Sequence, residues 1–269
     1  GNIGTAYTKE ALRMTEESVT AAEVSSFQLE TIDTFHPQVS AILNLTPDHL
    51  DRHGTMENYR NAKLDITKNQ TEEDLCVLNY EEETLRRRAE ELPCRVEFFS
   101  SKRSLDKGLY QDTAGNIVDG VSGEILMNMS ESNIPGDHNC ENIMAAILMT
   151  REMGVPLETI LRTVKGFHAV EHRVEFVQTV KGVDYYNDSK GTNPDAAIKG
   201  IQSMSRPTVL IGGGYDKGGG FEEWIRAFDG KVKKLLLMGQ TADKIVETAE
   251  ILGFHDYERV ETLEQAVSR

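Results

Sequence analysis

Residues 183–203 read VDYYNDSKGTNPDAAIKGIQS: a short apolar run, a polar turn and a helical pattern follow one another. Val183–Tyr186 predicts a strand, and the pattern over 194–203 predicts a helix. A strand that leads through a polar turn into a helix is the building block of α/β proteins with a mostly parallel sheet. We therefore expect an α/β fold class.

The same alternation continues outward over residues 171–269. Upstream, Val174–Val180 forms a predicted hairpin with Val183–Tyr186, which turns at Lys181-Gly182. Downstream, we expect strands at Thr208–Ile211 and Val232–Met238 and helices at 221–229, 241–252 and 262–268. This pattern predicts a doubly wound, Rossmann-like domain whose ligand sits beyond the carboxyl ends of its strands.

Residues 1–170 predict a separate, central domain with a mostly parallel sheet. The boundary is placed near His168–Glu171, where a helical pattern ends and a new strand begins. A hairpin over 109–119, turning at Ala114-Gly115-Asn116, interrupts the alternation. The other expected elements are strands at Val19–Val24, Val39–Leu45, Leu75–Asn79 and Arg95–Ser100 and helices at 57–67, 140–153 and 157–165.

Composition excludes several classes of protein. The formal net charge of −15 disfavours nucleic acid and anionic membrane surfaces as partners, because both attract cationic side chains. No apolar run is long enough to span a bilayer, and no signal peptide precedes the first motif, so we expect a cytoplasmic protein. Three widely spaced cysteines without a CxxC indicate neither a disulfide framework nor a cysteine metal site.

Two segments in the second half are suited to anions. Asp, Ser, Lys, Thr and Asn crowd the turn at 187–193, where free backbone N–H groups also point outward, whereas a helix cap needs only one such side chain. The glycine-rich loop 212–220 follows a predicted strand and carries Lys217, a positive charge for a carboxylate or phosphate. It matches neither a dinucleotide nor a Walker loop; a flexible linker is the alternative.

Glu23 follows an apolar run and predicts an acidic group at the ligand edge of the sheet. There it can hold Mg²⁺ directly or through water. The alternative is a capping or solvent-exposed carboxylate, which is common at such turns.

Lys63 lies on an apolar stripe. The spacing of Met56, Tyr59, Lys63 and Ile66 places its amine on the apolar side of a helix. A lysine kept from water has a lowered pKa, and its neutral amine can react with CO₂ to give a carbamate. The alternative is a lysine whose stem packs while its ammonium reaches solvent. His49, in the polar segment 46–52, is either a ligand or a hydrogen-bonded loop histidine.

The segment 136–142 opens a predicted helix. Asn139 is a candidate N-cap, which explains it without function. Asn142 lies on the same face one turn later, where its amide can pair with a base edge.

Together these segments resemble the Mur ligase family, over nearly the whole chain. The two most specific pieces, Ser25–Glu30 and Asn187–Asn193, match its D-glutamate-adding branch. The matching pieces are Gly1–Gly4, Glu23–Glu30, Asn44–Asp51, Tyr59–Lys63, Gly136–Asn142, His172–Glu175, Asn187–Asn193 and Gly212–Lys217.

The resemblance implies ATP-dependent amide synthesis through an acyl phosphate, with UDP-MurNAc-L-alanine and D-glutamate as substrates. It implies ATP and two Mg²⁺ ions as cofactors, and we expect a monomer. The implied metal ligands are Glu23, His49 and a carbamylated Lys63; the implied nucleotide contacts are Asn139, Asn142, Arg173 and Asp188. Asn2 is implied as a contact to the muramoyl substrate. Lys190, Thr192 and Lys217 are implied to lie near the transferring group and the D-glutamate carboxylates. The implied catalytic residues are Lys63, His49 and Lys190.

The sequence also departs from the family pattern. The family's amino-terminal uridine-nucleotide domain and its phosphate loop would precede Gly1, and a Ser-Pro-type segment would follow Arg269. We therefore expect this 269-residue piece, taken alone, not to turn over. The alternatives are a sibling ligase such as folylpolyglutamate synthetase, which lacks the Phe27-Gln28-Leu29 run, or a non-catalytic ligand-binding fragment.

Overall fold

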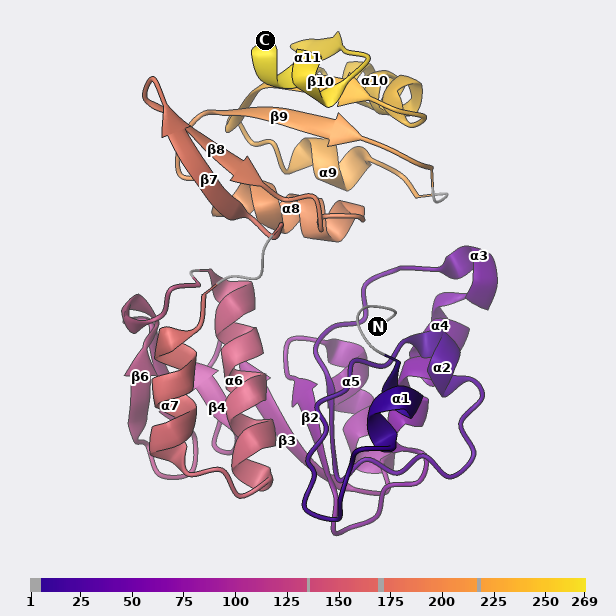
Figure 1. Ribbon diagram of the computed structural model, residues 1–269, viewed down its shortest axis with the longest axis vertical. Coiled ribbons are helices and arrows are strands. Elements are labelled where there is room, and N and C mark those ends of the chain that lie inside the picture. The colour runs from indigo at the N-terminus through magenta and orange to yellow at the C-terminus, as the bar shows by residue number, and fades with distance from the viewer. Residues whose placement is uncertain (1–5, 135, 169–171, 217–218) are drawn as a thin grey trace. The chain divides into compact units, whose positions relative to one another are not determined.

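The computed structural model describes residues 6–134, 136–168, 172–216 and 219–269 (Figure 1). The chain divides into two compact units, Gly1–Phe99 and Ser100–Arg269. The α/β fold class is confirmed, since parallel strands alternate with helices in both units. The domain boundary expected near residue 170 stays a prediction. None of the helices in the described ranges combines the length and apolarity that a membrane crossing requires.

The first unit contains three parallel strands. Every residue of β2 is buried, and β2 pairs with β1 on one side and β3 on the other, with Leu75 opposite both Val39 and Arg95. Burial on both faces explains why the continuous apolar run predicted β2 to the residue. β3 also begins and ends as predicted, although its first residue, Arg95, is exposed. The elements are α1 (Tyr7–Ala11), α2 (Ser26–Leu29), β1 (Val39–Ile42), α3 (Leu50–His53), α4 (Met56–Leu64), η1 (Asp65–Thr67), β2 (Leu75–Asn79), α5 (Glu83–Arg88), η2 (Ala89–Glu91) and β3 (Arg95–Ser100).

The strand predicted at Val19–Val24 is wrong. Residues 18–25 are neither strand nor helix, and Val19 is 72% exposed. The apolar run is short, and in the described part of the chain no strand pairs with it and no apolar side chains cover it. Without a neighbouring strand, its backbone has no ladder to join.

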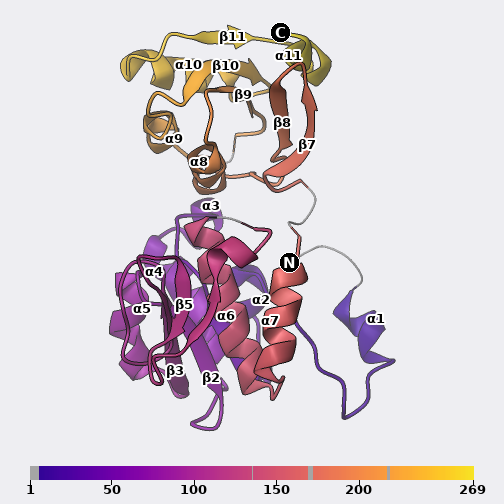
Figure 2. The same ribbon diagram turned by 90° about the vertical axis from the view of Figure 1, so that its left-hand side faces the viewer.

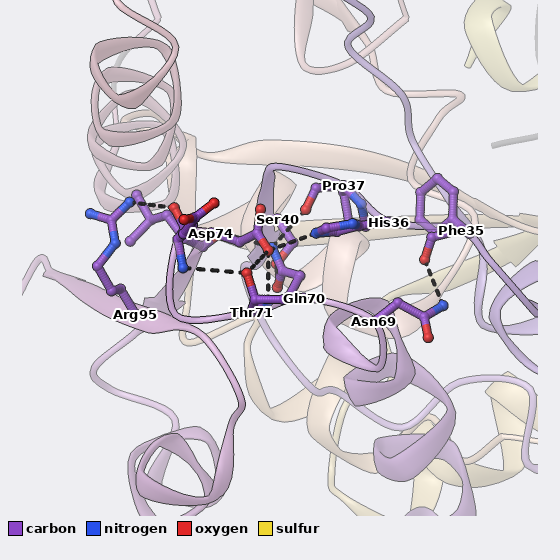
Figure 3. A network of polar contacts seen from close by, with 11 residues as sticks. Phe35, His36, Pro37, Ser40, Asn69, Gln70, Thr71, Asp74 and Arg95 are labelled. Carbon is purple, nitrogen blue, oxygen red and sulfur yellow. Dashed lines mark hydrogen bonds and ion pairs between the residues drawn. The ribbon is translucent and has the colours of Figure 1, made fainter.

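A polar network fixes the chain where it enters β1 and β2 (Figure 3). The Gln70 side chain accepts a hydrogen bond from Ser40 Oγ at 2.9 Å and donates to the carbonyls of Pro37 and Leu75. The Asp74 Oδ2 atom lies 2.6 Å from His36 Nε2 and accepts bonds from the backbone N–H and the hydroxyl of Thr71. The network, of which Ser40, Gln70 and Asp74 are buried, joins two loops that are far apart in sequence.

We expect this network to make the stability of the first unit sensitive to acid. Burial raises the pKa of the Asp74 carboxyl, but the bonds from His36 and Thr71 outweigh it and hold the pKa below its usual range. Such a carboxylate stabilises the fold above its unfolded pKa, about 3.9, and the stabilisation is lost as pH falls through the folded pKa. Asp74→Asn should cost about 1–3 kcal/mol at pH 7 and flatten the acid limb of a urea-unfolding series. The exposed Glu72→Gln is the control; an unchanged acid limb in Asp74→Asn would contradict the assignment.

The second unit begins with an antiparallel meander and two long helices. β4 (Leu109–Gln111) and β5 (Asn116–Asp119) form the predicted hairpin, and β6 (Ile125–Asn128) and η3 (Met129–Glu131) follow. α6 (Asp137–Glu152) and α7 (Leu157–Gly166) run side by side (Figures 1 and 2).

α6 begins after Gly136, whose φ is 101°, so the prediction of Asn139 as N-cap is wrong. A glycine in the left-handed region starts the helix one turn earlier.

The remainder of the second unit is the predicted Rossmann-like part. The β7–β8 hairpin turns at Lys181-Gly182, as predicted, where both φ values are positive. Three strands are parallel in the order β11-β10-β9, and Trp224, Leu235 and Ile245 are central to the core. The elements are β7 (Glu175–Val180), β8 (Val183–Asn187), α8 (Pro194–Ser203), β9 (Thr208–Gly213), α9 (Glu222–Arg226), β10 (Val232–Met238), α10 (Ala242–Ile251), β11 (Tyr257–Arg259) and α11 (Leu263–Ser268).

Gly213 ends β9 in a conformation that only glycine tolerates. Its φ is 117°, and a Cβ there would lie 2.0 Å from the Met238 carbonyl oxygen. We expect Gly213→Ala to lower the free energy of unfolding by about 3 kcal/mol or more, because strain and a backbone clash add. Gly230→Ala is the matched control, since φ is 71° and nothing lies within 4 Å; it should cost about 1–2 kcal/mol. If both variants lose the same free energy of unfolding in urea, the close approach of Gly213 to the Met238 carbonyl contributes nothing to the cost.

Candidate functional site

Three segments of the first unit carry the predicted metal ligands. Glu23 is exposed and precedes α2, which begins with a capping box between Ser25 and Gln28. His49 lies before α3, and Lys63 lies on α4, whose first turn is capped by Thr55. Side chains that accept hydrogen bonds from backbone N–H groups fix the first turns of α2 and α4, whereas α3 begins without such a side-chain cap.

His49 has a left-handed backbone, with φ of 52°. Its backbone N–H donates to Asp48 Oδ1 at 2.9 Å, and its Nε2 lies 3.6 Å from Asp48 Oδ2. The imidazole meets the Phe27 ring edge to face at 4.9 Å between centroids. Side-chain exposure of 43% leaves His49 open to a ligand.

Lys63 is half-buried, as its spacing predicted. Its Nζ lies 5.2 Å from the centroid of the Tyr59 ring, which is itself 5% exposed. Burial lowers the pKa of the Lys63 amine, and the charges of Asp48 and Glu23 oppose that shift. Burial and Asp48 raise the pKa of Tyr59 to about 12, so its ring stays neutral. A lowered pKa increases the fraction of neutral amine that can react with CO₂.

The donor chemistry of this cluster suits Mg²⁺ in part. Glu23 and Asp48 supply carboxylate oxygens near the Lys63 amine, and a carbamate on Lys63 would replace a cation with two more oxygens. In the ranges the structure describes, no three His, Cys, Asp or Glu side chains surround a single point where an ion would bind. Mg²⁺ is typically held by one or two carboxylates together with substrate phosphates and water, and the cluster fits that pattern.

A second cluster lies in the second unit around Asp188. Its Oδ1 accepts a hydrogen bond from the Val174 N–H at 3.0 Å. A Cβ on either Gly191 or Gly200 would lie 2.7 Å from Oδ2, so the carboxylate occupies space that two glycines leave free. Burial raises the pKa of the Asp188 carboxyl, while the Val174 N–H and the nearby charges of Arg173 and His138 oppose the shift.

The start of α6 contributes to the same electrostatic environment. Burial lowers the pKa of His138, and the positive charges of Lys199 and Arg173 add to that effect. Asn139, the next residue, is half-buried, and Asn142 is exposed. The structure therefore brings the charges of His138, Arg173 and Asp188 close to one another. Of the residues that the sequence assigned to a nucleotide, these contacts join Arg173 and Asp188, and the roles of Asn139 and Asn142 stay predictions.

The turn at 187–193 holds the remaining predicted residues. Lys190 is half-buried, and its backbone N–H donates to the His172 carbonyl at 2.9 Å. The exposed Thr192 follows it, and Asn193 caps α8 through the Ala196 N–H at 2.8 Å. Asn2 and Lys217 lie outside the described residues.

Two groups in these clusters had no predicted role. Asp48 faces Lys63 and His49, and its place beside His49 in a strand-to-helix loop was a usable signal. His53 is buried against Ser26 and Glu30, a contact across more than twenty residues that no local pattern reveals.

Comparisons with known proteins show the family to which the chain belongs. The family model "Mur ligase middle domain" matches residues 2–150, and "Mur ligase, glutamate ligase domain" matches residues 172–269. The chain belongs to the Mur ligase family. A curated relative, UDP-N-acetylmuramoylalanine–D-glutamate ligase of Lachnospira eligens, is 52% identical over 270 residues, which cover 99% of this chain and 60% of the relative. The chain thus spans about 60% of the length of the curated relatives it matches.

Solved structures share the fold. MurF from Acinetobacter baumannii superposes with a TM-score of 0.64 at 18% identity, covering 86% of this chain and 52% of that one. MurF ligase from Thermotoga maritima, solved in complex with ADP, gives a TM-score of 0.57 at 17% identity and covers 86% of this chain and 61% of its own. At such identities the likeness concerns the fold alone.

Proposed function

We propose that the protein containing this chain uses ATP to join D-glutamate to UDP-MurNAc-L-alanine, a step in peptidoglycan precursor synthesis. The observation that carries the proposal is the half-buried Lys63 amine beside Asp48 and Glu23 in a chain 52% identical to a relative named for this reaction. The substrate carboxylate attacks the γ-phosphorus of ATP, which releases ADP and leaves an acyl phosphate. The amine of D-glutamate then adds to the acyl carbon, and the tetrahedral intermediate collapses with loss of phosphate.

Each cluster has a proposed part in that chemistry. Glu23, His49 and a carbamylated Lys63 would hold two Mg²⁺ ions, which offset the negative charge that develops when two anions meet. Asn139, Asn142, Arg173 and Asp188 would bind the nucleotide, with Arg173 near the phosphates and Asp188 at the ribose. Lys190 and Lys217 would offset the negative charge of the transferring group and the D-glutamate carboxylates, and Thr192 would lie near the same groups. Asn2 would contact the muramoyl substrate.

The organisation of the protein is part of the proposal. We assign residues 1–170 to a central ATP- and metal-binding domain and residues 171–269 to an amino-acid-binding domain. We further propose a cytoplasmic monomer that acts on small molecules, with neither nucleic acid nor membrane as partner.

The direct test measures ADP release from ATP with UDP-MurNAc-L-alanine and D-glutamate. The chain is assayed alone and within a protein extended to the full length of its relatives. We expect turnover from the extended protein that requires both substrates. Preference for a folate or another amino acid would overturn the D-glutamate assignment in favour of a sibling ligase. Ligand binding without turnover would favour the non-catalytic alternative.

Replacing Lys63 separates chemistry from folding. Lys63→Met keeps the length of the side chain but cannot form a carbamate, so we expect kcat to fall about a hundredfold or more with little change in stability. Lys68→Met is the control, because Lys68 is an exposed lysine at the end of η1 in the same unit. Near-normal activity in Lys63→Met, measured in the extended protein, would contradict the proposed role of the amine.

Gly200→Ala tests the Asp188 site without touching Asp188 itself. The new methyl would displace the carboxylate, while the helix gains about 1 kcal/mol of propensity. We expect calorimetry to show about tenfold weaker ATP binding, which corresponds to the loss of one charged hydrogen bond. The free energy of unfolding should stay unchanged. Gly166→Ala, a helical glycine with nothing within 4 Å, should leave affinity unchanged. An unaltered affinity in Gly200→Ala would remove Asp188 from the nucleotide site.

A further inference from the structure

His53 is the most buried imidazole near the first cluster. Its side chain is 2% exposed, and both ring nitrogens have partners: Nε2 lies 3.0 Å from Ser26 Oγ, and Nδ1 lies 3.1 Å from Glu30 Oε1. The Glu30 carboxylate accepts, so Nδ1 carries a proton, and Nε2 can accept from the serine hydroxyl. The second Glu30 oxygen accepts from Arg52 at 3.0 Å.

The ring of His53 also packs between two aromatic side chains. It stacks on Phe27, with centroids 5.4 Å apart and planes 5° from parallel, and it lies 5.3 Å from Tyr59. Its carbonyl accepts a bond from Asn58 Nδ2 at 2.9 Å. His53 is thus in contact with α2 and α4 while it ends α3.

Through one intermediate residue each, these contacts reach His49 and Lys63, and along the chain they come close to Glu23. The backbone N–H of His53 donates to the His49 carbonyl at 3.0 Å, and Phe27, on which the His53 ring stacks, packs against the His49 ring. Tyr59 lies beneath the Lys63 amine, and Ser26 follows Glu23 by three residues. A buried side chain with a single orientation, joined to three short segments, can fix ligands that the segments alone would hold loosely.

The order Ser26, His53, Glu30 resembles that of a hydrolase triad, but burial argues against nucleophilic catalysis. Ser26 is 5% exposed, so its hydroxyl has no room for a substrate carbonyl. The bonds therefore serve orientation.

We propose that His53 is a positioning residue that holds His49 and Lys63 in the geometry that binds the divalent metal. The inference rests on the proposed function, which gives the identity of the reaction. Metal affinity can be measured without turnover and so does not depend on that function.

The test compares His53→Phe with wild type in the extended protein. Phenylalanine keeps the aromatic packing and removes both hydrogen bonds. Mn²⁺ binding is followed by electron paramagnetic resonance with ADP present, and the half-saturating Mg²⁺ concentration is measured in the ADP-release assay. We expect both constants to rise about tenfold, as for other residues that orient metal ligands, while KM for D-glutamate stays within about twofold.

Further variants test the two hydrogen bonds of His53 separately and control for loss of folding. His53→Asn retains a donor near the Nδ1 position and His53→Gln a polar group near Nε2, so each should recover part of the metal affinity. Ser26→Ala removes one partner only and remains informative if His53→Phe does not fold. His36→Phe, which breaks the 2.6 Å contact with Asp74 in the same unit, should lower the melting temperature without changing Mn²⁺ affinity.

The outcomes are distinct. Unchanged Mn²⁺ affinity in His53→Phe and Ser26→Ala, or an equal loss in His36→Phe, would overturn the positioning role. If His53→Phe weakens Mn²⁺ binding while the wild-type extended protein releases no ADP, the positioning role is supported and the proposed reaction is rejected.

Discussion

The candidate chemistry depends on an amine kept partly out of water. Burial disfavours the ammonium form of Lys63, and the neighbouring carboxylates of Asp48 and Glu23 favour it. This balance requires α4 to be held firmly, which its Thr55 cap and the buried Tyr59 achieve. If the helix turned, the amine would reach solvent and become an ordinary surface lysine.

Much of the fold could be predicted from the sequence where a strand has a run of consecutive buried residues. β2, β3 and β10 begin and end as predicted. β2 is buried throughout, and β10 contains the buried run Leu235–Leu237. The spacing of Tyr59 and Lys63 likewise predicted a shared apolar side, because helical periodicity is local. The polar turn at 187–193 also lies where expected, between β8 and α8.

Features that depend on residues far away in the sequence could not be predicted from it. Val19–Val24 has the composition of a strand, yet its exposed backbone shows that composition without a neighbouring strand is insufficient. The contacts of His53 with Ser26 and Glu30 join residues more than twenty positions apart. The left-handed φ of His49 is likewise not indicated by any local pattern. The early start of α6 depends on the conformation of Gly136, which the sequence permits but does not require.

The glycines at 191 and 200 form one structural unit with Asp188, because each leaves open the volume that a single carboxylate oxygen occupies. The three positions are coupled: a side chain introduced at either glycine requires a shorter or differently oriented group at 188. Libraries that vary this region one position at a time would therefore reject combinations that are acceptable together, so recombination among relatives should transfer the three residues as a block.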